Sequence, residues 1–328
     1  MKNRALGPFN VSAIGLGCMN LSHAYGAPAT AEQGEALLMH ALDRGVTLFD
    51  TAALYGFGAN EDLVGKVLSK HRRRFTLASK CGMVGVDGKR VIDGRPATLK
   101  RTCEESLKRL RTDVIDLYYL HRWDKTVPIE DSVGALSDLV RQGKIQTIGL
   151  SEVSASTLRK AHAVHPITAL QTEYSLWTRN PEIAVLQACK ELGTAFVAFS
   201  PVARGFLTGA LTDISTLDAK DLRRSMPRFT PDNYAANLRL LEGLKAIAQD
   251  AGCTLAQLAI AWLLQQGEHV IPIPGTTRIT HLDEDLAAAN VQLSPQVLAR
   301  LNTLMQPRSI TAGRYNAQSQ SEVDTEEF

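Results

Sequence analysis

The chain has 328 residues, and its 36 Lys and Arg side chains nearly balance its 34 Asp and Glu side chains, for a formal net charge of +2 at pH 7. This balance argues against a nucleic-acid or anionic-membrane partner, and no apolar run is long enough to cross a bilayer. The five cysteines are an odd number without Cys-x-x-Cys spacing, which predicts neither a disulfide framework nor a zinc site. Because the N-terminal segment lacks the apolar core of a signal peptide, we expect a cytoplasmic protein.

Short apolar runs rich in β-branched residues alternate with segments of helical periodicity along the chain. The runs, each expected to form a strand, lie at residues 12–17, 46–50, 75–80, 114–120, 145–151, 167–172, 195–200 and 269–275. The segments expected to be helical lie at residues 31–45, 99–113, 129–144, 154–163, 182–193, 237–252, 254–267 and 281–290. This alternation predicts parallel strands that are buried on both faces.

Eight strands, each followed by helical sequence, predict an α/β fold of the (β/α)8 TIM-barrel type. No linker or break in composition divides the chain, so residues 1–328 are expected to form one domain, with the polar, acidic stretch 316–328 as a mobile tail. A doubly wound fold is the alternative, since GLGCMN (15–20) opens like a dinucleotide-binding fingerprint. Its third glycine is replaced by Asn20 and no helix is expected directly after it, so we interpret this stretch as a tight turn.

Ionisable side chains stand where three of the predicted strands end. Asp50 ends the second strand and is followed by Tyr55 in FDTAALYG, Lys80 ends the third, and His121 ends the fourth. A barrel gathers these strand ends on one face, where such folds carry their chemistry. Lys80 beside the phenol would lower the Tyr55 pKa, and Asp50 would hold the lysine charged and in place. Tyr55 would then be a general acid; FDTAALYG alone is equally compatible with a helix-capping Asp and a Tyr that only packs.

At these four residues the sequence resembles the aldo-keto reductases, in which the matching positions form the catalytic tetrad. The resemblance covers about residues 6 to 305 and continues through IGLSEVS, LQTEYSLWTR, AFSPVARGFLTG and IPIPGTTRITHLDEDLAAA. The run 151–179 is most similar to the branch that includes pyridoxal reductases and perakine reductase. The resemblance implies an NADP-dependent oxidoreductase that reduces an aldehyde or a ketone with NADPH, with Tyr55 as proton donor and His121 orienting the carbonyl oxygen.

The same resemblance implies how the chain binds NADPH. Ser151 and Gln171 are expected to hold the carboxamide, with Glu152 where the family often has Asn, and Phe199 is expected to stack on the nicotinamide where the family usually has Tyr. SPVARGFL would wrap the pyrophosphate, GTTR would bind the 2′-phosphate near a helix N-terminus, and residues 281–285 would meet the adenine. The expected cofactor-binding residues are Gly17, Cys18, Met19, Asp50, Ser151, Glu152, Gln171, Phe199, Ser200, Pro201, Val202, Arg204, Gly205, Leu207, Gly275, Thr277, Arg278, His281, Glu284 and Asp285.

The substrate side of the site is less readable from the sequence. Four aromatic side chains in rim loops are as compatible with an apolar substrate pocket as with core packing: Tyr25, Phe57, Trp123 and Trp177. The stretch 211–234 is expected to be a long loop that forms a flap over the cofactor. No residues show metal-ligand spacing, so no metal is expected.

Two other functions are compatible with this sequence. Some members of the family are cofactor-bound, non-enzymatic subunits of potassium channels, and an intact tetrad is compatible with an NADPH-bound regulatory subunit of that kind. A barrel enzyme that forms a Schiff base through Lys80 is the other alternative. The sequence indicates neither the physiological substrate nor the oligomeric state nor the direction of the reaction in the cell.

Overall fold

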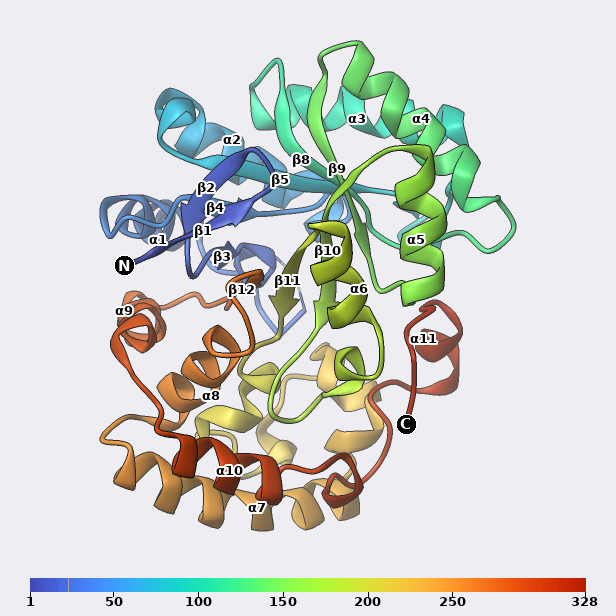
Figure 1. Ribbon diagram of the computed structural model, residues 1–328. Coiled ribbons are helices and arrows are strands. Elements are labelled where there is room, and N and C mark those ends of the chain that lie inside the picture. The colour runs from blue at the N-terminus through green and yellow to red at the C-terminus, as the bar shows by residue number, and fades with distance from the viewer. Residues whose placement is uncertain (23) are drawn as a thin grey trace.

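The computed structural model describes residues 1–22 and 24–328. Its centre is a sheet of eight strands, all paired in parallel, in the order β12-β11-β10-β9-β8-β5-β4-β3. The amides of Gly15 and Gly17 donate to the carbonyl oxygens of Pro272 and Pro274, both at 3.0 Å, which closes the sheet into a barrel (Figure 1). The predicted (β/α)8 barrel is therefore confirmed. Its strands are β3 (Leu16–Gly17), β4 (Leu48–Asp50), β5 (Thr76–Cys81), β8 (Ile115–Leu120), β9 (Ile145–Ser151), β10 (Ile167–Glu173), β11 (Ala195–Phe199) and β12 (Val270–Pro272).

Helices cover the outside of the barrel, and every segment predicted to be helical contains one. Two of them begin at capping boxes in which a threonine hydroxyl and a glutamine side chain satisfy each other's backbone amides, Thr30 with Gln33 and Thr254 with Gln257. The predicted helices are observed as α1 (Ala31–Asp43), α3 (Pro96–Leu110), α4 (Ile129–Arg141), α5 (Ala155–Val164), α6 (Val185–Leu192), α7 (Pro231–Asp250), α8 (Leu255–Leu264) and α9 (Ile279–Ala287).

Three helices were not predicted. One is α2 (Ala59–Leu68), between β4 and β5, where Gly65 interrupts the apolar pattern. A Cβ at Gly65 would lie 2.2 Å from the Arg109 carbonyl oxygen at the end of α3, so only glycine lets the two helices approach this closely. The others are α10 (Pro295–Leu304), which lies beside α7 (Figure 1), and α11 (Ala317–Ser321).

Two hairpins were also missed. The strand expected at 12–17 is divided in the structure, because β1 (Asn3–Leu6) and β2 (Phe9–Ser12) form an antiparallel hairpin before the short β3. Leu6 and Val11 of this hairpin are fully buried among inward-facing strand side chains, so the hairpin plugs the amino-terminal end of the barrel. A second hairpin, β6 (Met83–Val86) with β7 (Lys89–Ile92), follows β5 and stands at the carboxyl-end rim.

The C-terminal stretch expected to be a mobile tail is packed against the barrel instead. The Asp324 carboxylate accepts hydrogen bonds from the Ser154 amide at 3.2 Å and from the Thr157 hydroxyl at 2.7 Å. The Glu326 carboxylate accepts from the Ala155 amide at 2.8 Å. These carboxylates stabilise the positive N-terminal end of α5. The prediction was based on polarity, and the same acidic residues are the ones that bind the helix end.

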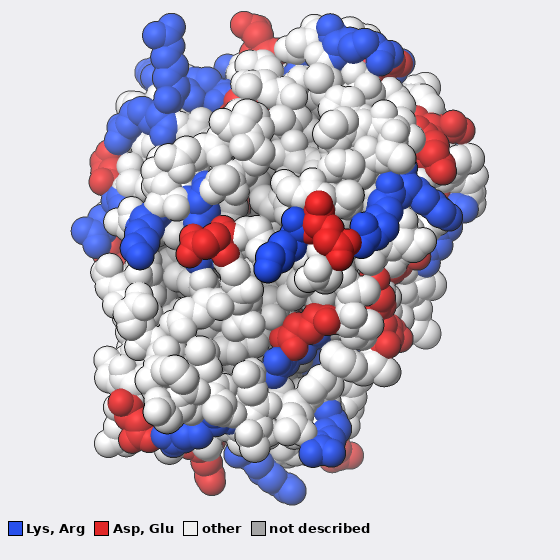
Figure 2. Space-filling model, viewed as in Figure 1, with Lys and Arg blue, Asp and Glu red and all other residues white. Residues whose placement is uncertain are grey.

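The segment 211–234 is likewise more ordered than the predicted loop, since three short 3-10 helices precede the start of α7. Among the described residues, no single helix is long and apolar enough to cross a membrane; α7 and α8 reach that length and composition only together, across a bend of 78°. On the face shown in Figure 2, acidic and basic side chains are interspersed rather than gathered by sign.

Candidate active site

Four side chains meet at the carboxyl ends of neighbouring strands. Asp50 is the last residue of β4, Lys80 lies near the end of β5, and His121 follows β8 directly. Tyr55 begins a short 3-10 helix in the loop after β4. The parallel pairing of β4 with β5 and of β5 with β8 brings these ends together. The structure thus assembles the set that was predicted from the order of the strands.

The Lys80 ammonium group is fully buried and is held by three oxygen atoms. It forms an ion pair with Asp50 and donates to the Thr51 carbonyl oxygen at 2.8 Å and to the Tyr55 hydroxyl at 3.3 Å. Burial lowers the Lys80 pKa, but the Asp50 carboxylate and the Tyr55 phenol outweigh burial and leave the pKa above its usual value. Lys80 is therefore held protonated.

Tyr55 lies edge-to-face with His121, with ring centroids 5.7 Å apart and ring planes at 82°. Burial raises the pKa of the Tyr55 phenol, and the positive charges of Lys80 and Arg122 oppose this effect without reversing it. The expected lowering of the Tyr55 pKa is therefore wrong for the protein alone, because the prediction left out the cost of ionising a buried phenol. The phenol keeps its proton at neutral pH and can donate it.

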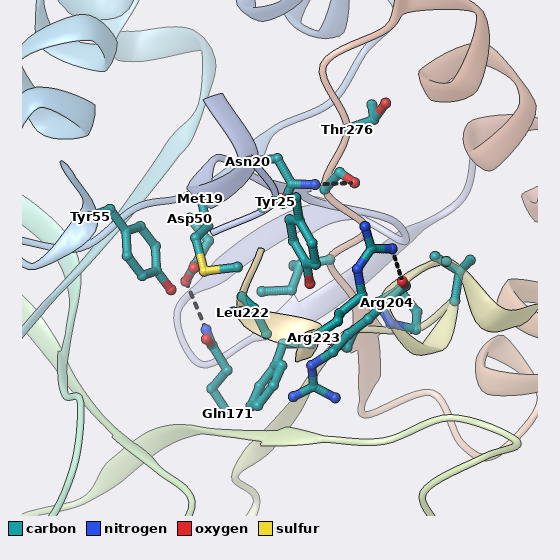
Figure 3. Close-up of a pocket in the computed structure, with 18 of the residues that line it drawn as sticks. Met19, Asn20, Tyr25, Asp50, Tyr55, Gln171, Arg204, Leu222, Arg223 and Thr276 are labelled. Atoms are coloured by element: carbon teal, nitrogen blue, oxygen red, sulfur yellow. Dashed lines mark hydrogen bonds between the residues drawn. The ribbon is translucent and has the colours of Figure 1, made fainter. Parts of the chain in front are cut away.

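The tetrad stands at one end of a cavity of about 630 Å³ at the carboxyl face of the barrel. In Figure 3, Tyr55, Asp50 and Gln171 lie on one side of this cavity, and Arg204 and Arg223 lie on the other. The Gln171 amide nitrogen donates to the second Asp50 oxygen at 2.7 Å. The predicted cofactor-binding residues that line the cavity are Gly17, Met19, Asp50, Ser151, Gln171, Phe199, Ser200, Pro201, Val202, Arg204, Gly205, Gly275, Thr277, Arg278, His281, Glu284 and Asp285.

The wall of the cavity fits an extended dinucleotide with a terminal phosphate. Gly275 lines this wall and packs closely against its neighbours, since a Cβ there would lie 2.8 Å from the Asn20 side-chain oxygen and 2.9 Å from the Gly17 carbonyl oxygen. Beyond Gly275, the Arg278 guanidinium stands on the cavity beside the N-terminus of α9, where the helix dipole also favours an anion. The cavity has amide and hydroxyl groups at the tetrad end, from Gln171 and Ser151, and the Arg278 cation at the other end. These groups match the two ends of such a molecule.

An unusual carboxyl group lies at the α9 end. Asp285 is buried yet lines the cavity. Burial, and secondly the neighbouring Glu284 carboxylate, raise the pKa of Asp285 to about 7. Asp285 is therefore a hydrogen-bond donor below neutral pH and an anion above it.

Comparison with known proteins identifies the family. The sequence pattern of the "Aldo/keto reductase family" matches residues 13–306. The chain is 43% identical over 311 residues to "Probable aldo-keto reductase 1" of Glycine max, which covers 94% of this chain and 89% of that protein. This chain belongs to the aldo/keto reductase family.

Solved structures agree with this assignment. A glycerol dehydrogenase from Gluconobacter oxydans is similar with a TM-score of 0.85 and 27% identity, over 96% of this chain and 99% of that one. An aldo/keto reductase from Klebsiella pneumoniae, solved with NADP and acetate, is similar with a TM-score of 0.73 and 28% identity, over 99% of both chains.

Two expected cofactor contacts of this aldo/keto reductase lie in the core rather than on the cavity. The Cys18 side chain is fully buried, and its thiol faces the Leu16 carbonyl oxygen at 3.8 Å. Leu207 is also buried, and its amide already donates to the Val202 carbonyl oxygen at 3.2 Å. Each residue is adjacent to one that does line the cavity, Met19 and Thr208 respectively, and the motif alone does not show which residues face inward.

Glu152 is the third correction. Its carboxylate forms a buried ion pair with Arg314 of the C-terminal segment and accepts from the Glu173 amide at 2.9 Å. It therefore points away from the position where a carboxamide contact was expected. The Glu152 backbone is left-handed, with φ of 57°, a conformation that Asn adopts more readily than Glu. No local pattern predicts a partner so distant in sequence.

Of the four rim aromatics, only Tyr25 lines the cavity, where the Arg223 guanidinium lies 5.0 Å from its ring centroid. Phe57 is 58% exposed, and Trp123 donates its indole N–H to the Val127 carbonyl oxygen at 2.9 Å. Trp177 is buried and stacks on Phe206, with centroids 4.1 Å apart. Phe57, Trp123 and Trp177 thus do not line this cavity in the structure, because aromatic type alone does not separate packing from lining.

Several lining residues were missed. Most of them come from the β6–β7 hairpin, the segment before α7 and the C-terminal segment, none of which the family motifs cover, whereas Asn20, Arg122 and Thr276 lie next to predicted site residues. Arg90 of the hairpin and Glu322 of the C-terminal segment form an ion pair at the cavity. Arg122 could have been found, because it follows His121 in HRWD. The missed residues include Asn20, Met83, Arg90, Arg122, Leu222, Arg223, Met226, Thr276, Tyr315, Ser319 and Glu322.

Proposed function

We propose that this aldo/keto reductase reduces aldehydes or ketones to alcohols with NADPH. The observation that carries the proposal is the position of the Tyr55 hydroxyl, 3.3 Å from the buried Lys80 ammonium group that Asp50 anchors. The His121 ring lies beside Tyr55 on the same cavity, so a carbonyl oxygen bound there would face both side chains. Bound NADPH would supply the hydride.

The four residues have separate roles in this proposal. Tyr55 donates its proton to the substrate oxygen as negative charge develops there, and His121 orients that oxygen. The Lys80 cation stabilises the phenolate that Tyr55 becomes, and Asp50 keeps Lys80 charged and in place. The high pKa of the buried phenol favours the protonated form at the start of the step.

We assign the cofactor along the cavity from the tetrad to α9. Ser151 and Gln171 hold the carboxamide and Phe199 stacks on the nicotinamide ring. Arg278 pairs with the 2′-phosphate, which predicts a preference for NADPH over NADH. The other assigned contacts are Gly17 and Met19 near the ribose, Ser200, Pro201, Val202, Arg204 and Gly205 at the pyrophosphate, Gly275 and Thr277 beside the 2′-phosphate, and His281, Glu284 and Asp285 at the adenine.

The two alternatives have less support. A Schiff base needs a neutral amine, but the Lys80 pKa is raised and the ammonium group is held by Asp50, Thr51 and Tyr55. A non-enzymatic subunit would need no proton donor poised beside the cavity. Within the family, we propose the branch of pyridoxal and perakine reductases, and we keep the cytoplasmic location as a prediction.

Multiple-turnover oxidation of NADPH tests the proposal. The assay uses pyridoxal, nitrobenzaldehydes and methylglyoxal, and also glycerol with NADP in the reverse direction, because one structural relative is a glycerol dehydrogenase. Sustained turnover with any of the carbonyl compounds supports the proposal. Tight NADPH binding without turnover would favour the regulatory subunit, and a borohydride-trapped adduct on Lys80 would favour the Schiff-base enzyme.

A further inference from the structure

Arg122 reaches from the end of β8 to the end of β9. Its Nη1 group donates to the His121 carbonyl oxygen at 2.7 Å and to the Ser151 hydroxyl oxygen at 3.2 Å. The side chain lines the cavity together with Tyr55 and Gln171. One guanidinium therefore lies against both the tetrad and a residue assigned to the carboxamide.

Within the described part of the chain, the charge of Arg122 is not neutralised by a carboxylate. Over residues 1–22 and 24–328, the structure gives no carboxylate within ion-pair distance of Arg122. Three other arginines on the cavity wall each pair with a carboxylate: Arg90 with Glu322, Arg204 with Glu173 and Arg223 with Asp221. The hydrogen bonds that the structure gives Arg122 instead go to neutral groups, the His121 carbonyl oxygen and the Ser151 hydroxyl.

The hydrogen bond from Arg122 determines whether the Ser151 hydroxyl acts as a donor or an acceptor toward the cavity. A serine hydroxyl has one hydrogen to donate, and Arg122 can only donate, so the Ser151 oxygen accepts from Arg122 and its hydrogen is left for another acceptor. Gln171 is fixed in the opposite sense, because its amide nitrogen donates to Asp50 at 2.7 Å and its carbonyl oxygen remains an acceptor. Ser151 thus offers a proton and Gln171 offers a lone pair.

A carboxamide has the complementary pair of groups, a carbonyl oxygen and an NH₂. We propose that Arg122 is a positioning residue for the nicotinamide: by donating to Ser151 it turns the serine hydroxyl toward the carboxamide oxygen, while Asp50 turns Gln171 toward the carboxamide NH₂. Together the two charged residues allow the carboxamide one orientation, which fixes the ring face toward the tetrad. This inference rests on the proposed function, since it presumes a nicotinamide cofactor.

Arg122 has a second effect through its charge. Among residues 1–22 and 24–328, the groups that face the Tyr55 phenol include Asp50 from β4, Lys80 from β5, and His121 and Arg122 from the end of β8. The Arg122 charge opposes the rise in the Tyr55 pKa that burial causes. Removing the charge should therefore raise the pKa that controls the high-pH limb of kcat.

Equilibrium binding separates positioning from a merely structural role. The probes are NADP and 2′,5′-ADP, which carries the adenine and the 2′-phosphate but no nicotinamide. Arg122→Gln and Ser151→Ala are each expected to weaken NADP by about 3- to 10-fold, the value of one lost hydrogen bond, and to leave 2′,5′-ADP unchanged. Both variants remove the hydrogen bond between Arg122 and Ser151. The double variant should therefore bind NADP no more weakly than whichever single variant binds it more weakly. The inference would be overturned if the variants bound NADP and 2′,5′-ADP with equally weakened affinity, or if the losses of NADP affinity in the two single variants added up in the double variant.

The pH profile of kcat separates the charge from the hydrogen bond. Arg122→Gln is expected to move the high-pH limb upward, whereas Arg122→Lys and Ser151→Ala should leave it in place. The control is Arg101→Gln on α3, which removes the same charge from a side chain that is 62% exposed. It should change neither the binding constants nor the profile. If the pH profile of kcat were the same in Arg122→Gln as in the wild type, the inferred effect of the Arg122 charge on Tyr55 would be overturned.

The binding comparison needs no turnover. If the wild-type protein bound NADP but reduced no carbonyl compound, the proposed function would fail while the Arg122 inference could still succeed. If it turned over substrates while Arg122→Gln bound both probes normally, the inference would fail and the proposed function would stand.

Discussion

Arg314 of the C-terminal segment forms a buried ion pair with Glu152, the residue that follows β9. The same guanidinium lies 3.6 Å from a carboxylate oxygen of Glu173, at the end of β10. The carboxylates of two barrel strands are thus neutralised by a residue that comes after the last barrel helix. The C-terminal segment is therefore part of the folded barrel and of the cavity wall.

This relationship predicts a large loss of stability in Arg314→Ala. The variant leaves Glu152 buried without its partner, which should lower the free energy of unfolding by about 3–5 kcal/mol. Urea denaturation monitored by fluorescence measures the change. The matched control is Arg159→Ala, which breaks an exposed ion pair with Glu191 on neighbouring helices and should cost about 0–1 kcal/mol. Equal losses in the two variants would contradict the structural role of Arg314.

The barrel was predictable because periodic apolar segments and the order of strands are local features of the sequence. The tetrad was predictable for the same reason, since each member stands at the end of a strand. The Arg314–Glu152 pair was not, because it joins residues far apart in the chain by side-chain geometry alone. The exclusion of Cys18 and Leu207 from the cavity likewise depends on which way a loop residue faces, and aromatic type did not show that Trp177 packs on Phe206.

Lys80→Met should affect both stability and catalysis. The raised pKa of Lys80 means that its ion pair stabilises the fold at neutral pH, and that this stabilisation is lost only as the pH rises past the usual lysine range. Without Lys80, Asp50 is buried and unpaired, at a cost of about 3–5 kcal/mol. The Tyr55 pKa should rise further, because the largest of the effects that lower it is gone. An unchanged melting temperature together with an unchanged pH–rate profile would show that Lys80 is not part of the tetrad.

Asp285→Asn should stabilise the protein at alkaline pH. The Asp285 pKa of about 7 lies above that of an unfolded aspartate. Folding therefore favours the protonated form, and the stability of the wild type falls as the pH rises from about 4 to 7. The neutral amide avoids this loss, so the gain in melting temperature should be larger at pH 8 than at pH 5.

The neighbouring, half-buried Asp283 provides the control for Asp285. Asp283→Asn removes a carboxylate whose pKa is lowered, chiefly by a hydrogen bond with His40, so it should give no gain at pH 8. A gain for Asp285→Asn that did not depend on pH would rule out a titrating carboxyl as the cause.

Arg278→Ala should remove most of a preference for NADPH. No Asp or Glu stands at residues 275–279 to repel the 2′-phosphate, and the guanidinium can bind it with charge-assisted hydrogen bonds. Losing such a bond costs about 1.5–3 kcal/mol, which corresponds to an NADPH affinity about 10- to 150-fold weaker. NADH affinity should barely change, and fluorescence titration measures both constants. Wild-type protein that already prefers NADH, or a mutant in which both cofactors weaken equally, would show that Arg278 does not bind the phosphate.

The central claim is that Tyr55 is the proton donor, and Tyr55→Phe tests it most directly. The substitution keeps the ring against His121 and removes only the hydroxyl that Lys80 contacts at 3.3 Å. NADPH binding by fluorescence should stay near the wild-type value, whereas kcat for an aldehyde that the wild type reduces should fall by about 10²- to 10⁴-fold. Wild-type turnover in Tyr55→Phe would contradict the assignment.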